Sequence, residues 1–464
     1  MSSEKQFRVF SIWALVHFIL PTLSFAQVIW GGQGHSLSVC TDGTVRTWGW
    51  NGYGELGDGT IIERDNPVQV SGLTGVIAIG GGGQFSVALK NDGTIWAWGD
   101  NSLRQVGDGT TVERHTPVQV SGLAGIIAIA AGEHHSLALK SDGTVWAWGS
   151  NGVGQLGIGT FTQSNNPIQV SGLTGITAVA CGGFHSLALK NDGSVWSWGL
   201  NTFGELGDGT NTQTAFPIQV VNLTGIIAIS GGENHSLALK NNGTVWAWGD
   251  NSSGELGDIT ITSRNSPVQT SVLTGILAIA AGGAHSYAVK NNGTLWVWGE
   301  NGYGQLGDGT TTNKNTPVQV NGLSGCTSIA CGEIHSLILK NTGTVWTCGR
   351  NNGGQLGDGS TTDSSSPIQV IGLCSVSNGA EELNEQSYIS IFPIPSSGKF
   401  NIKIPENKLY DISVFNVLGE NIFEQKQITS SQRIIDLSKV STGIYFAQIT
   451  IDNKSFSKKI AISK

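Results

Sequence analysis

One stretch of about 50 residues recurs along most of this chain, and the repeat constrains the fold more than any other feature. Proline marks each copy, at Pro67, Pro117, Pro167, Pro217, Pro267, Pro317 and Pro367. Histidine recurs with the same period in most copies. A fixed long period indicates that one structural unit is repeated in space. The sequence therefore predicts seven copies of a single supersecondary unit.

Each copy is expected to contain four short strands. In one copy, residues 117–120 form one predicted strand, and the apolar run 126–131 has the length of a buried strand. Residues 135–140 alternate with a period of two, and residues 144–148 place two Trp rings on one face. The Asp-Gly pair between these last two runs is typical of a tight hairpin, because both residues tolerate a positive φ. The repeat unit is therefore predicted to be a four-stranded antiparallel sheet.

Seven such sheets are expected to form a β-propeller. A single sheet cannot bury both of its faces, whereas a closed ring places each sheet between two neighbours. The Trp pairs, such as Trp146 and Trp148, are expected to pack between the blades. The sequence thus predicts an all-β fold, with a seven-bladed β-propeller of four-stranded blades at residues 27–377.

Three motifs recur in most copies: Gly-x-x-His-Ser-Leu-Ala-Leu, Asp-Gly-Thr-Val-Trp-Ala-Trp-Gly-x-Asn and Gly-Gln-Leu-Gly-Asp-Gly-Thr. Over about residues 28–376 they resemble the repeat of the regulator of chromosome condensation family. This resemblance implies a seven-bladed propeller and a protein that binds protein partners. The best-known role of the family is nucleotide exchange on a small GTPase.

The two ends of the repeat region are expected to share one blade. The first copy enters at the motif Gly34-His35-Ser36, which we assign to a third strand, and the last copy ends after the first-strand motif at residues 367–370. C-terminal strands would then complete the blade that N-terminal strands begin, and so close the ring. Cys40 and Cys374 lie near the two ends and are a candidate disulfide, although the sequence leaves the pairing of the six cysteines open.

Residues 1–26 have the pattern of a secretory signal peptide. Lys5 and Arg8 precede a mostly apolar run, and small residues at positions 24 and 26 favour cleavage between Ala26 and Gln27. The apolar run is too short to span a membrane. We therefore expect an exported protein.

Residues 387–464 differ in composition from the repeats. They contain more Lys, Ile and Ser, far less Gly and no Trp, and the polar residues 378–386 form an expected linker before them. Short alternating runs separated by turn signals predict a small C-terminal β-sandwich.

This C-terminal segment carries the motifs Ile391-Phe392-Pro393-Ile394-Pro395, Ser441-Thr442-Gly443-Ile444-Tyr445 and Lys458-Lys459-Ile460. Through these motifs it resembles the C-terminal sorting domain of the type IX (Por) secretion system. The family usually has Asn-Pro where this chain has Ile394-Pro395. The resemblance implies export by the type IX machinery, removal of the segment, and release or attachment at the outer cell surface. The residues that carry it include Pro393, Pro395, Gly419, Gly443, Tyr445, Lys458 and Lys459.

The distribution of charge argues against nucleic acid as a partner. The whole chain has a net charge of −8, and residues 27–384 carry 13 Lys and Arg against 25 Asp and Glu. Binding to a phosphate backbone requires a basic stripe. The acidic repeat region lacks one.

Three repeated motifs could suggest catalysis or ligand binding, but each has a structural explanation. Gly52–Gly57 fits the dinucleotide-binding pattern without the strand, helix and acidic residue that such a site needs. Asp58 and its equivalents offer one carboxylate per loop, too few for calcium, and suit a turn. The His-Ser pairs are repeated around a wide ring and suit buried hydrogen bonds. We therefore expect no catalytic residues, no cofactor and no metal.

Positions that differ between copies are the candidates for binding. Scaffold positions must agree between blades, whereas loops on an exposed face need not. Exposed aromatic side chains are frequent contact anchors. The candidate binding-face residues are Tyr53, Leu103, Arg104, Phe203, Tyr303, His134 and Phe184.

The leading hypothesis is a secreted or surface-displayed, non-enzymatic propeller that binds an extracellular protein or glycan. One alternative is a regulator of a small GTPase that acts as an exchange factor. Export and an acidic surface argue against it. Another alternative is a secreted enzyme that acts on polysaccharide, which would require paired carboxylates in a cleft.

Overall fold

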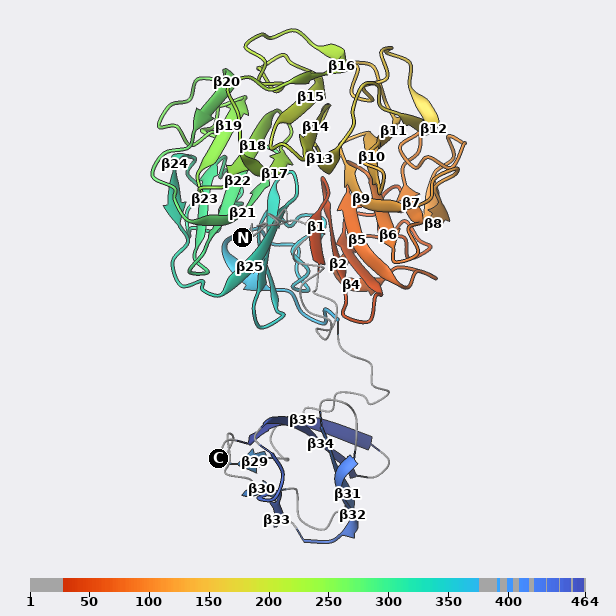
Figure 1. Ribbon diagram of the computed structural model, residues 1–464, viewed down its shortest axis with the longest axis vertical. Helices are drawn as coiled ribbons and strands as arrows, with labels where there is room; N and C mark the ends of the chain where they lie inside the picture. Colours follow the sequence, from red (N-terminus) through yellow and green to blue (C-terminus); the bar gives the residue numbers. More distant parts are fainter. Residues whose placement is uncertain are drawn as a thin grey trace, which may run out of the picture. The chain divides into compact units, whose positions relative to one another are not determined.

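The chain divides into two compact units between Cys374 and Ser375, and each unit is described by itself. The computed structural model describes residues 28–374, 390–392, 399–403, 409–416, 421–430, 432–441, 443–451 and 454–462 (Figure 1). Within these ranges every regular element is a β-strand, and no helix with the length and apolarity of a membrane span occurs. The predicted signal peptide, its cleavage site at Ala26 and Gln27, and the linker at 378–386 lie outside the described residues.

Each blade of the first unit is a four-stranded antiparallel sheet of consecutive strands. Blade 1 contains β1 (Val28–Gly31), β2 (His35–Val39), β3 (Val45–Gly49) and β4 (Arg64–Gln69). The strands follow one another in this order across the sheet, from the ring axis to the rim. A tight turn joins the second strand to the third, and a loop of residues 50–63 joins the third to the fourth.

The other six blades repeat this order. Their strands are β5 (Val76–Gly81), β6 (Phe85–Lys90), β7 (Ile95–Gly99) and β8 (Arg114–Gln119) in blade 2; β9 (Ile126–Ala131), β10 (His135–Lys140), β11 (Val145–Gly149) and β12 (Ser164–Gln169) in blade 3; β13 (Ile176–Cys181), β14 (His185–Lys190), β15 (Val195–Gly199) and β16 (Thr214–Gln219) in blade 4; β17 (Ile226–Gly231), β18 (His235–Lys240), β19 (Val245–Gly249) and β20 (Arg264–Gln269) in blade 5; β21 (Ile276–Ala281), β22 (His285–Lys290), β23 (Leu295–Gly299) and β24 (Lys314–Gln319) in blade 6; and β25 (Cys326–Cys331), β26 (His335–Lys340), β27 (Val345–Gly349) and β28 (Ser364–Gln369) in blade 7.

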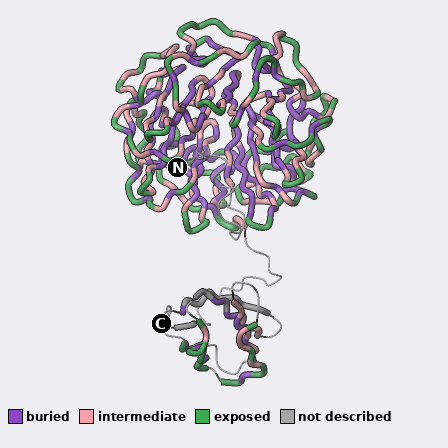
Figure 2. Tube along the Cα trace, viewed as in Figure 1, coloured by how far each residue is buried: buried purple, intermediate pink, exposed green. Residues whose placement is uncertain are grey.

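The seven inner strands contact one another in a closed cycle, from β1 through β5, β9, β13, β17, β21 and β25 back to β1. Figure 1 shows the blades arranged around this centre. Figure 2 shows buried residues concentrated in the blades and exposed residues along the outer loops. The all-β, seven-bladed propeller expected from the repeat is thereby confirmed.

The boundaries of the blades differ from our expectation. We expected the strand that carries the repeated proline to open a blade. In the structure, Pro117 lies in β8, which pairs with β7 and is the outermost strand of the preceding sheet. The reason is that the loop after β7 returns the chain to the free edge of β7. The linker after β8 then crosses to β9, the inner strand of the next blade.

The chain ends therefore do not share a blade. All four strands of blade 1 come from residues 28–69, and all four strands of blade 7 come from residues 326–369. The expectation that C-terminal strands complete the first blade is wrong.

Contacts between neighbouring blades close the ring instead. In blade 7, the backbone N–H of Glu333 donates to the carbonyl of Gly32 in blade 1 at 3.2 Å. Equivalent bonds link each of the remaining six pairs of neighbouring blades, so the bonds form a complete circle. Between blades 1 and 2, for example, Gln33 N–H donates to the Gly82 carbonyl at 3.1 Å. The disulfide between Cys40 and Cys374 adds a covalent link between blade 1 and the end of the propeller unit, and confirms the candidate pair.

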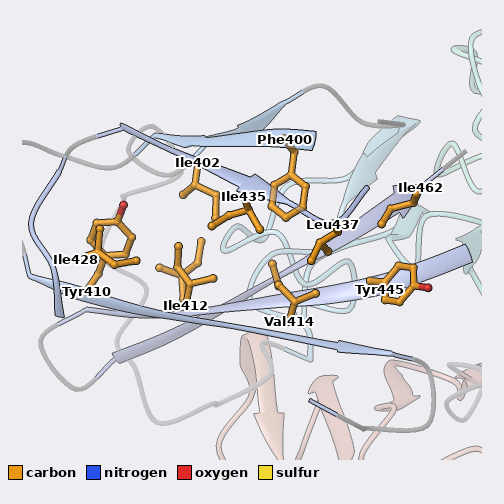
Figure 3. Close-up of a cluster of buried hydrophobic side chains, with 12 residues drawn as sticks. Phe400, Ile402, Tyr410, Ile412, Val414, Ile428, Ile435, Leu437, Tyr445 and Ile462 are labelled. Atoms are coloured by element: carbon orange, nitrogen blue, oxygen red, sulfur yellow. The ribbon is translucent and has the colours of Figure 1, made fainter. Parts of the chain in front are cut away.

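The second unit consists of two packed sheets. Side chains of the smaller sheet, including Phe400 and Ile435, face Ile412, Val414 and Tyr445 of the larger one across a single buried core (Figure 3). The smaller sheet contains β29 (Ser390–Phe392), β30 (Lys399–Lys403) and β33 (Gln432–Asp436); the larger contains β32 (Asn421–Ile428), β31 (Tyr410–Asn416), β34 (Gly443–Ile451) and β35 (Lys454–Ile462). The predicted C-terminal β-sandwich is confirmed.

Candidate functional site

The strands of every blade run between two ends of the propeller, which we name the loop face and the turn face. The loop face carries the connections between first and second strands and the long loops between third and fourth strands. In blade 1 the two meet where Trp50 N–H donates to the Gly34 carbonyl at 2.9 Å. The turn face carries the hairpin turns and the linkers to the next blade, which meet where Asn91 N–H donates to the Gly75 carbonyl at 2.9 Å.

One buried asparagine organises each long loop. In blade 1, the Asn51 side chain donates to the carbonyl of Ile62 at 3.0 Å and accepts from the Leu56 N–H at 2.9 Å. Asp58 accepts from the backbone and hydroxyl of Thr60 at 2.9 and 2.6 Å. This is the turn geometry expected for the Asp-Gly-Thr motif. The repeated carboxylate thus holds the loop in shape.

The long loop also reaches the next blade and forms what we name the joint between two blades. The Glu55 carbonyl of blade 1 accepts hydrogen bonds from the Trp98 indole at 2.7 Å and the Ser86 hydroxyl at 2.8 Å, both in blade 2. His35 Nε2 of blade 1 lies 2.9 Å from the same hydroxyl. Each joint therefore combines a loop carbonyl with donors from the following blade.

The geometry of the joint sets the protonation of its histidine. Because the Ser86 hydroxyl donates to a carbonyl, it accepts from His35 Nε2–H. His35 Nδ1 is buried and has no hydrogen-bond partner in the described part of the chain, so nothing there stabilises a second proton on the ring. Burial, together with the charge of His335, lowers the pKa of His35 to about 3. Each His-Ser motif therefore contributes to structural hydrogen bonds between blades, as the sequence indicated, and the structure adds that the histidine is neutral.

The joint between blades 6 and 7 is built differently. Cys348 stands where the other blades have the buried Trp, and Tyr287 stands where they have Leu or Val. The Tyr287 hydroxyl donates to the Gln305 carbonyl at 2.6 Å and lies 3.5 Å from Cys348 Sγ. Both side chains are fully buried. The phenol of blade 6 thus supplies the donor and the volume that an indole supplies elsewhere.

The residues predicted to bind all lie on the loop face, because they belong to the two kinds of connection found there. Tyr53, Phe203 and Tyr303 are among its exposed large side chains, at 37, 40 and 40% exposure. Half-buried members of the set are Leu103 and Arg104, beside each other in blade 2, and His134 and Phe184, whose ring centroids lie 6.0 Å apart.

Arg104 occupies a backbone position that the other blades give to glycine. Its φ is 72°, in the left-handed region that disfavours L side chains. At the equivalent Gly154, an added Cβ would lie 2.7 Å from Ala215 Cα. Strained residues of this kind are enriched at ligand-binding sites. This observation supports keeping Arg104 among the candidates.

Sequence reasoning missed two further residues of the loop face. Trp50 is 41% exposed, and the Arg350 guanidinium lies 5.1 Å from the centre of the Tyr303 ring. Both occupy the position between the repeated Gly and the repeated Asn, and the residue at this position also varies from blade to blade. Comparison of this position among the seven repeats would have identified them.

Three glutamates lie in the inner loops around the axis on the loop face. Glu133, Glu233 and Glu333 belong to blades 3, 5 and 7, and the even-numbered blades have glycine at this position. A Cβ added to Gly83 would lie 3.0 Å from Glu133 Cγ, so the alternation leaves room for each carboxylate. Burial, followed by the charges of the other two glutamates, raises the pKa of Glu133 to about 7. In the described residues, His, Cys, Asp and Glu form no cluster suited to a metal.

The two faces differ in charge. Of the Lys, Arg, Asp and Glu residues in 28–374, the loop face carries 19 acidic and 6 basic side chains, whereas the turn face carries 4 acidic and 7 basic ones. The acidity of the propeller is therefore concentrated on the loop face.

Two shallow grooves lie beside the loops of blades 4 to 6. One has a volume of about 320 Å³, and Phe203, Asn211 and Asn265 are among its lining residues. The other has a volume of about 310 Å³ and is lined in part by Ile261 and Asn313. Within the described residues, the lining of both is uncharged apart from Arg264. Neither groove presents the carboxylate pair that glycoside hydrolysis uses.

The residues of the predicted sorting motif are described in part. Tyr445 is buried, and its hydroxyl donates to the Ser441 carbonyl at 2.9 Å. Gly443 begins β34, and Lys458 and Lys459 lie in β35 opposite residues of β34. The positions Pro393, Pro395 and Gly419 lie outside the described residues.

Solved structures share the propeller fold. Human WBSCR16 superposes with a TM-score of 0.64 at 24% identity, covering 70% of this chain and 94% of that one. Prp20p from Saccharomyces cerevisiae superposes with a TM-score of 0.65 at 23% identity, covering 75% and 88%. At these identities the likeness establishes the fold alone.

A sequence relative covers a much shorter stretch. The ultraviolet-B receptor UVR8 of Arabidopsis thaliana is 40% identical over 47 residues, which is 10% of this chain and 11% of the receptor. The chain thus spans about a tenth of the length of this curated relative.

Family models match both units. The model of the RCC1-like domain matches residues 124–391, and the regulator of chromosome condensation (RCC1) repeat matches residues 42–89, 92–139 and 76–105. The secretion system C-terminal sorting domain matches residues 390–463. Both resemblances seen in the sequence are confirmed. The chain belongs to the RCC1-like domain family and carries a secretion system C-terminal sorting domain after its propeller.

Proposed function

We propose that this protein is an exported, non-enzymatic binding scaffold whose loop face engages an extracellular protein or glycan. The observation that carries the proposal is the contrast between buried joints and exposed loop tips. The joints repeat the same hydrogen bonds, whereas the tips present aromatic side chains that differ from blade to blade.

The exposed aromatic residues are held in place before any partner binds. The backbone N–H of Tyr53 donates to Glu55 Oε2 at 2.8 Å, and that of Phe203 donates to Glu205 Oε2 at 2.8 Å. Tyr303 N–H donates in the same way to a glutamine side chain at 2.9 Å. A preorganised contact surface loses less conformational entropy on binding. These bonds support a rigid binding face.

Export through the type IX machinery is supported by the sorting domain and by the expected signal peptide. We expect the mature protein to begin at Gln27 and to lack the C-terminal unit, either in the medium or attached to the outer cell surface. Mass spectrometry of fractionated native cells and medium tests this. An intact chain in the cytoplasm would contradict export and favour the exchange-factor alternative.

Binding through the loop face can be tested with the mature protein purified from its native location. We expect saturable binding to cells that lack the protein, and at least a tenfold weaker affinity for the triple variant Tyr53→Ala, Phe203→Ala and Tyr303→Ala. The matched control removes two exposed apolar side chains elsewhere, Ile127→Ala and Ile371→Ala. Equal binding by the loop variant and the wild type would refute the assignment of this face.

Two activity assays separate this proposal from its alternatives. Accelerated nucleotide release from a small GTPase would support an exchange factor. Release of reducing sugar from polysaccharide would support a hydrolase. We expect neither activity, and we expect no cofactor and no binding to nucleic acid.

A further inference from the structure

On the turn face, blades 2 to 4 and blades 5 to 7 differ in the charge of their hairpin turns. In six blades a lysine ends the second strand, and in blades 2 to 4 an aspartate follows two residues later. Lys140 Nζ, for example, lies 3.2 Å from Asp142 Oδ2. In blades 5 to 7 the aspartate is replaced by Asn242, Asn292 and Thr342.

The lysines of blades 5 to 7 therefore carry uncompensated charge. Lys240, Lys290 and Lys340 make no ion pair within the described residues. In blade 1 the charge of Asp42 faces that of Arg46. The net positive charge of the turn face thus arises from three adjacent blades. We name the surface formed by these three lysines the basic arc.

Each ammonium group of the basic arc rests on an aromatic ring. The Nζ atoms of Lys240, Lys290 and Lys340 lie 5.8, 5.8 and 5.4 Å from the centres of the Trp246, Trp296 and Trp346 rings. These contacts hold the charges close to the protein surface. They also cover a face of each indole.

An exposed apolar residue with a strained backbone lies beside the basic arc. Val272 is 82% exposed and has a φ of 56°, at a position where five other blades have glycine and one has Asn222. A Cβ added to the equivalent Gly172 meets nothing within 4 Å. A β-branched residue in this conformation is a genuine outlier, and its side chain gains no packing in return.

The linker that carries Val272 runs between two turns of the basic arc. Ile276 N–H donates to the Gly243 carbonyl in the turn after Lys240, at 3.1 Å. Asn291 N–H, in the turn after Lys290, donates to the Gly275 carbonyl at 2.9 Å. The strained apolar side chain and the uncompensated lysines therefore belong to one surface.

We propose that the basic arc, together with Val272, docks an acidic polypeptide segment of a partner protein that carries an apolar side chain among its carboxylates. Carboxylates complement the lysines, and the apolar side chain covers Val272. A neutral sugar would seek a flat aromatic platform, but the lysines already cover a face of each indole. A lipid surface would require more inserted apolar side chains than a single valine. This surface is separate from the loop face and does not depend on the function proposed for it.

The repeat supplies a matched test of this surface. The probe is a fluorescent 15-residue peptide of glutamate with interspersed leucine, titrated by anisotropy against the purified full chain. We expect Lys240→Gln, Lys290→Gln and Lys340→Gln together to weaken binding at least tenfold. The control is Lys90→Gln, Lys140→Gln and Lys190→Gln, which changes the net charge equally; we expect less than a twofold effect. Equal weakening by the two sets would overturn the proposal.

A second set of variants keeps every lysine. Asn242→Asp, Asn292→Asp and Thr342→Asp copy the residue that blades 2 to 4 already carry, so the fold should tolerate them. We expect the same loss of peptide binding, and undiminished binding would contradict the role of uncompensated charge. Val272→Gly should raise the midpoint of thermal unfolding and weaken peptide binding several-fold. Unchanged binding would remove Val272 from the surface.

Two further probes test the class of partner. Polygalacturonate offers carboxylates without apolar side chains, and vesicles of phosphatidylglycerol offer an anionic lipid surface. We expect both to bind more weakly than the acidic peptide at equal ionic strength. Tighter binding of either probe, lost in the Lys240, Lys290 and Lys340 variant, would show that the partner is a polysaccharide or a membrane.

Discussion

Six joints of the propeller place an indole N–H on the loop carbonyl of the preceding blade, whereas the joint between blades 6 and 7 places a phenol there. The indole donor is typified by Trp98 on the Glu55 carbonyl, and the phenol is Tyr287 on the Gln305 carbonyl. The phenol comes from the blade before the joint, and Cys348 leaves the space that it fills. A joint thus requires filled volume and, beside the serine hydroxyl of the following blade, a second donor to the loop carbonyl that either blade can supply.

The joint between blades 2 and 3 shows the same tolerance for a different group. Phe85 stands where the other blades have histidine, yet the Ser136 hydroxyl still donates to the Gln105 carbonyl at 3.1 Å. The histidine therefore adds a hydrogen bond to a joint that the carbonyl and the packing already define.

The largest effect is expected from restoring one common residue alone. Cys348→Trp forces an indole into the volume that Tyr287 occupies, and overpacking a closed core is strongly unfavourable. We expect a loss of about 3 kcal/mol in the free energy of unfolding, at the upper end of the usual cost of overpacking because an indole is much larger than a thiol. Thermal and urea unfolding of the purified protein measure it.

The double variant Cys348→Trp and Tyr287→Leu decides whether the two substitutions are coupled. It recreates the common joint, and we expect stability within about 1 kcal/mol of the wild type because contacting residues are not additive. If the double variant is as unstable as the sum of the single variants, the phenol does not replace the indole.

The second largest loss of stability is expected when the Cys40–Cys374 disulfide is removed. This disulfide lies at the joint between the first and last blades and joins residues 334 positions apart. Cys40→Ser with Cys374→Ser should lower the free energy of unfolding by roughly 2–4 kcal/mol, because the unfolded chain is no longer constrained. Hydrogen exchange should rise first in β1 and β28. The control Cys181→Ala changes a buried free cysteine to a residue found at equivalent positions. A uniform rise in hydrogen exchange over all blades would argue against a local role of the disulfide in closing the ring of blades.

A smaller effect is expected where the residue that shapes the loop is glutamate rather than glutamine. Glu55 Oε1 is buried without a donor in the described residues, and burial raises the pKa of Glu55 to about 7, above its ordinary value of 4.5. Its contribution to stability is thus present below pH 4.5 and lost as the pH rises through 7. Glu55→Gln, which copies the loops of blades 2, 3, 6 and 7, should raise stability by about 1–2 kcal/mol at pH 8. The gain should vanish at pH 5, so a gain that is equal at both pH values would contradict this explanation.

The smallest effect at neutral pH is expected from copying the joint between blades 2 and 3. His185→Phe removes the bond to Ser236 and should cost about 1 kcal/mol at pH 7.5. Burial, with the charges of His135 and His235, lowers the pKa of His185 to about 3 from 6.5. The stability that the neutral histidine provides is therefore present above pH 6.5 and lost as the pH falls toward 3.

Lowering the pH should therefore reduce or reverse the difference in the free energy of unfolding between the wild type and His185→Phe. At pH 5 a buried neutral histidine loses roughly 2 kcal/mol relative to neutral pH. The phenylalanine variant does not share this loss. Unfolding midpoints of both proteins from pH 8 to pH 5 measure the crossing. Parallel curves would mean that folding does not lower the pKa of His185, which would contradict this explanation.

Much of the fold could be predicted because the signals are local. The alternation within strands and the Asp-Gly turns depend on neighbouring residues, and the period of 50 residues can be read from the sequence without any knowledge of contacts. The phase of the blades could not be predicted in this way. Whether the proline strand pairs backward with β7 or opens the next sheet depends on where a loop returns the chain, and both arrangements have the same period.

The candidate site was predictable in part for the same reason. Variation between copies identified the loops of Tyr53, Phe203 and Tyr303, and the structure places these residues on one face. The same comparison of the seven repeats could have identified Trp50 and Arg350, because the residue at their position also differs between the repeats. The strain at Arg104 is visible only as a backbone angle.

The repeat, the strand content, the structural role of the His-Ser pairs and the kinship of both units could be read from the amino-acid sequence alone. These properties follow from residue types and their spacing along the chain. Three features became visible in the folded protein alone: the chain ends do not share a blade, Tyr287 takes the place of an indole, and the acidic side chains are concentrated on the loop face. They arise from contacts between residues that are not neighbours in the sequence, such as Tyr287 with Gln305 and with Cys348, 18 and 61 positions apart, and from the end of the strand at which each loop emerges.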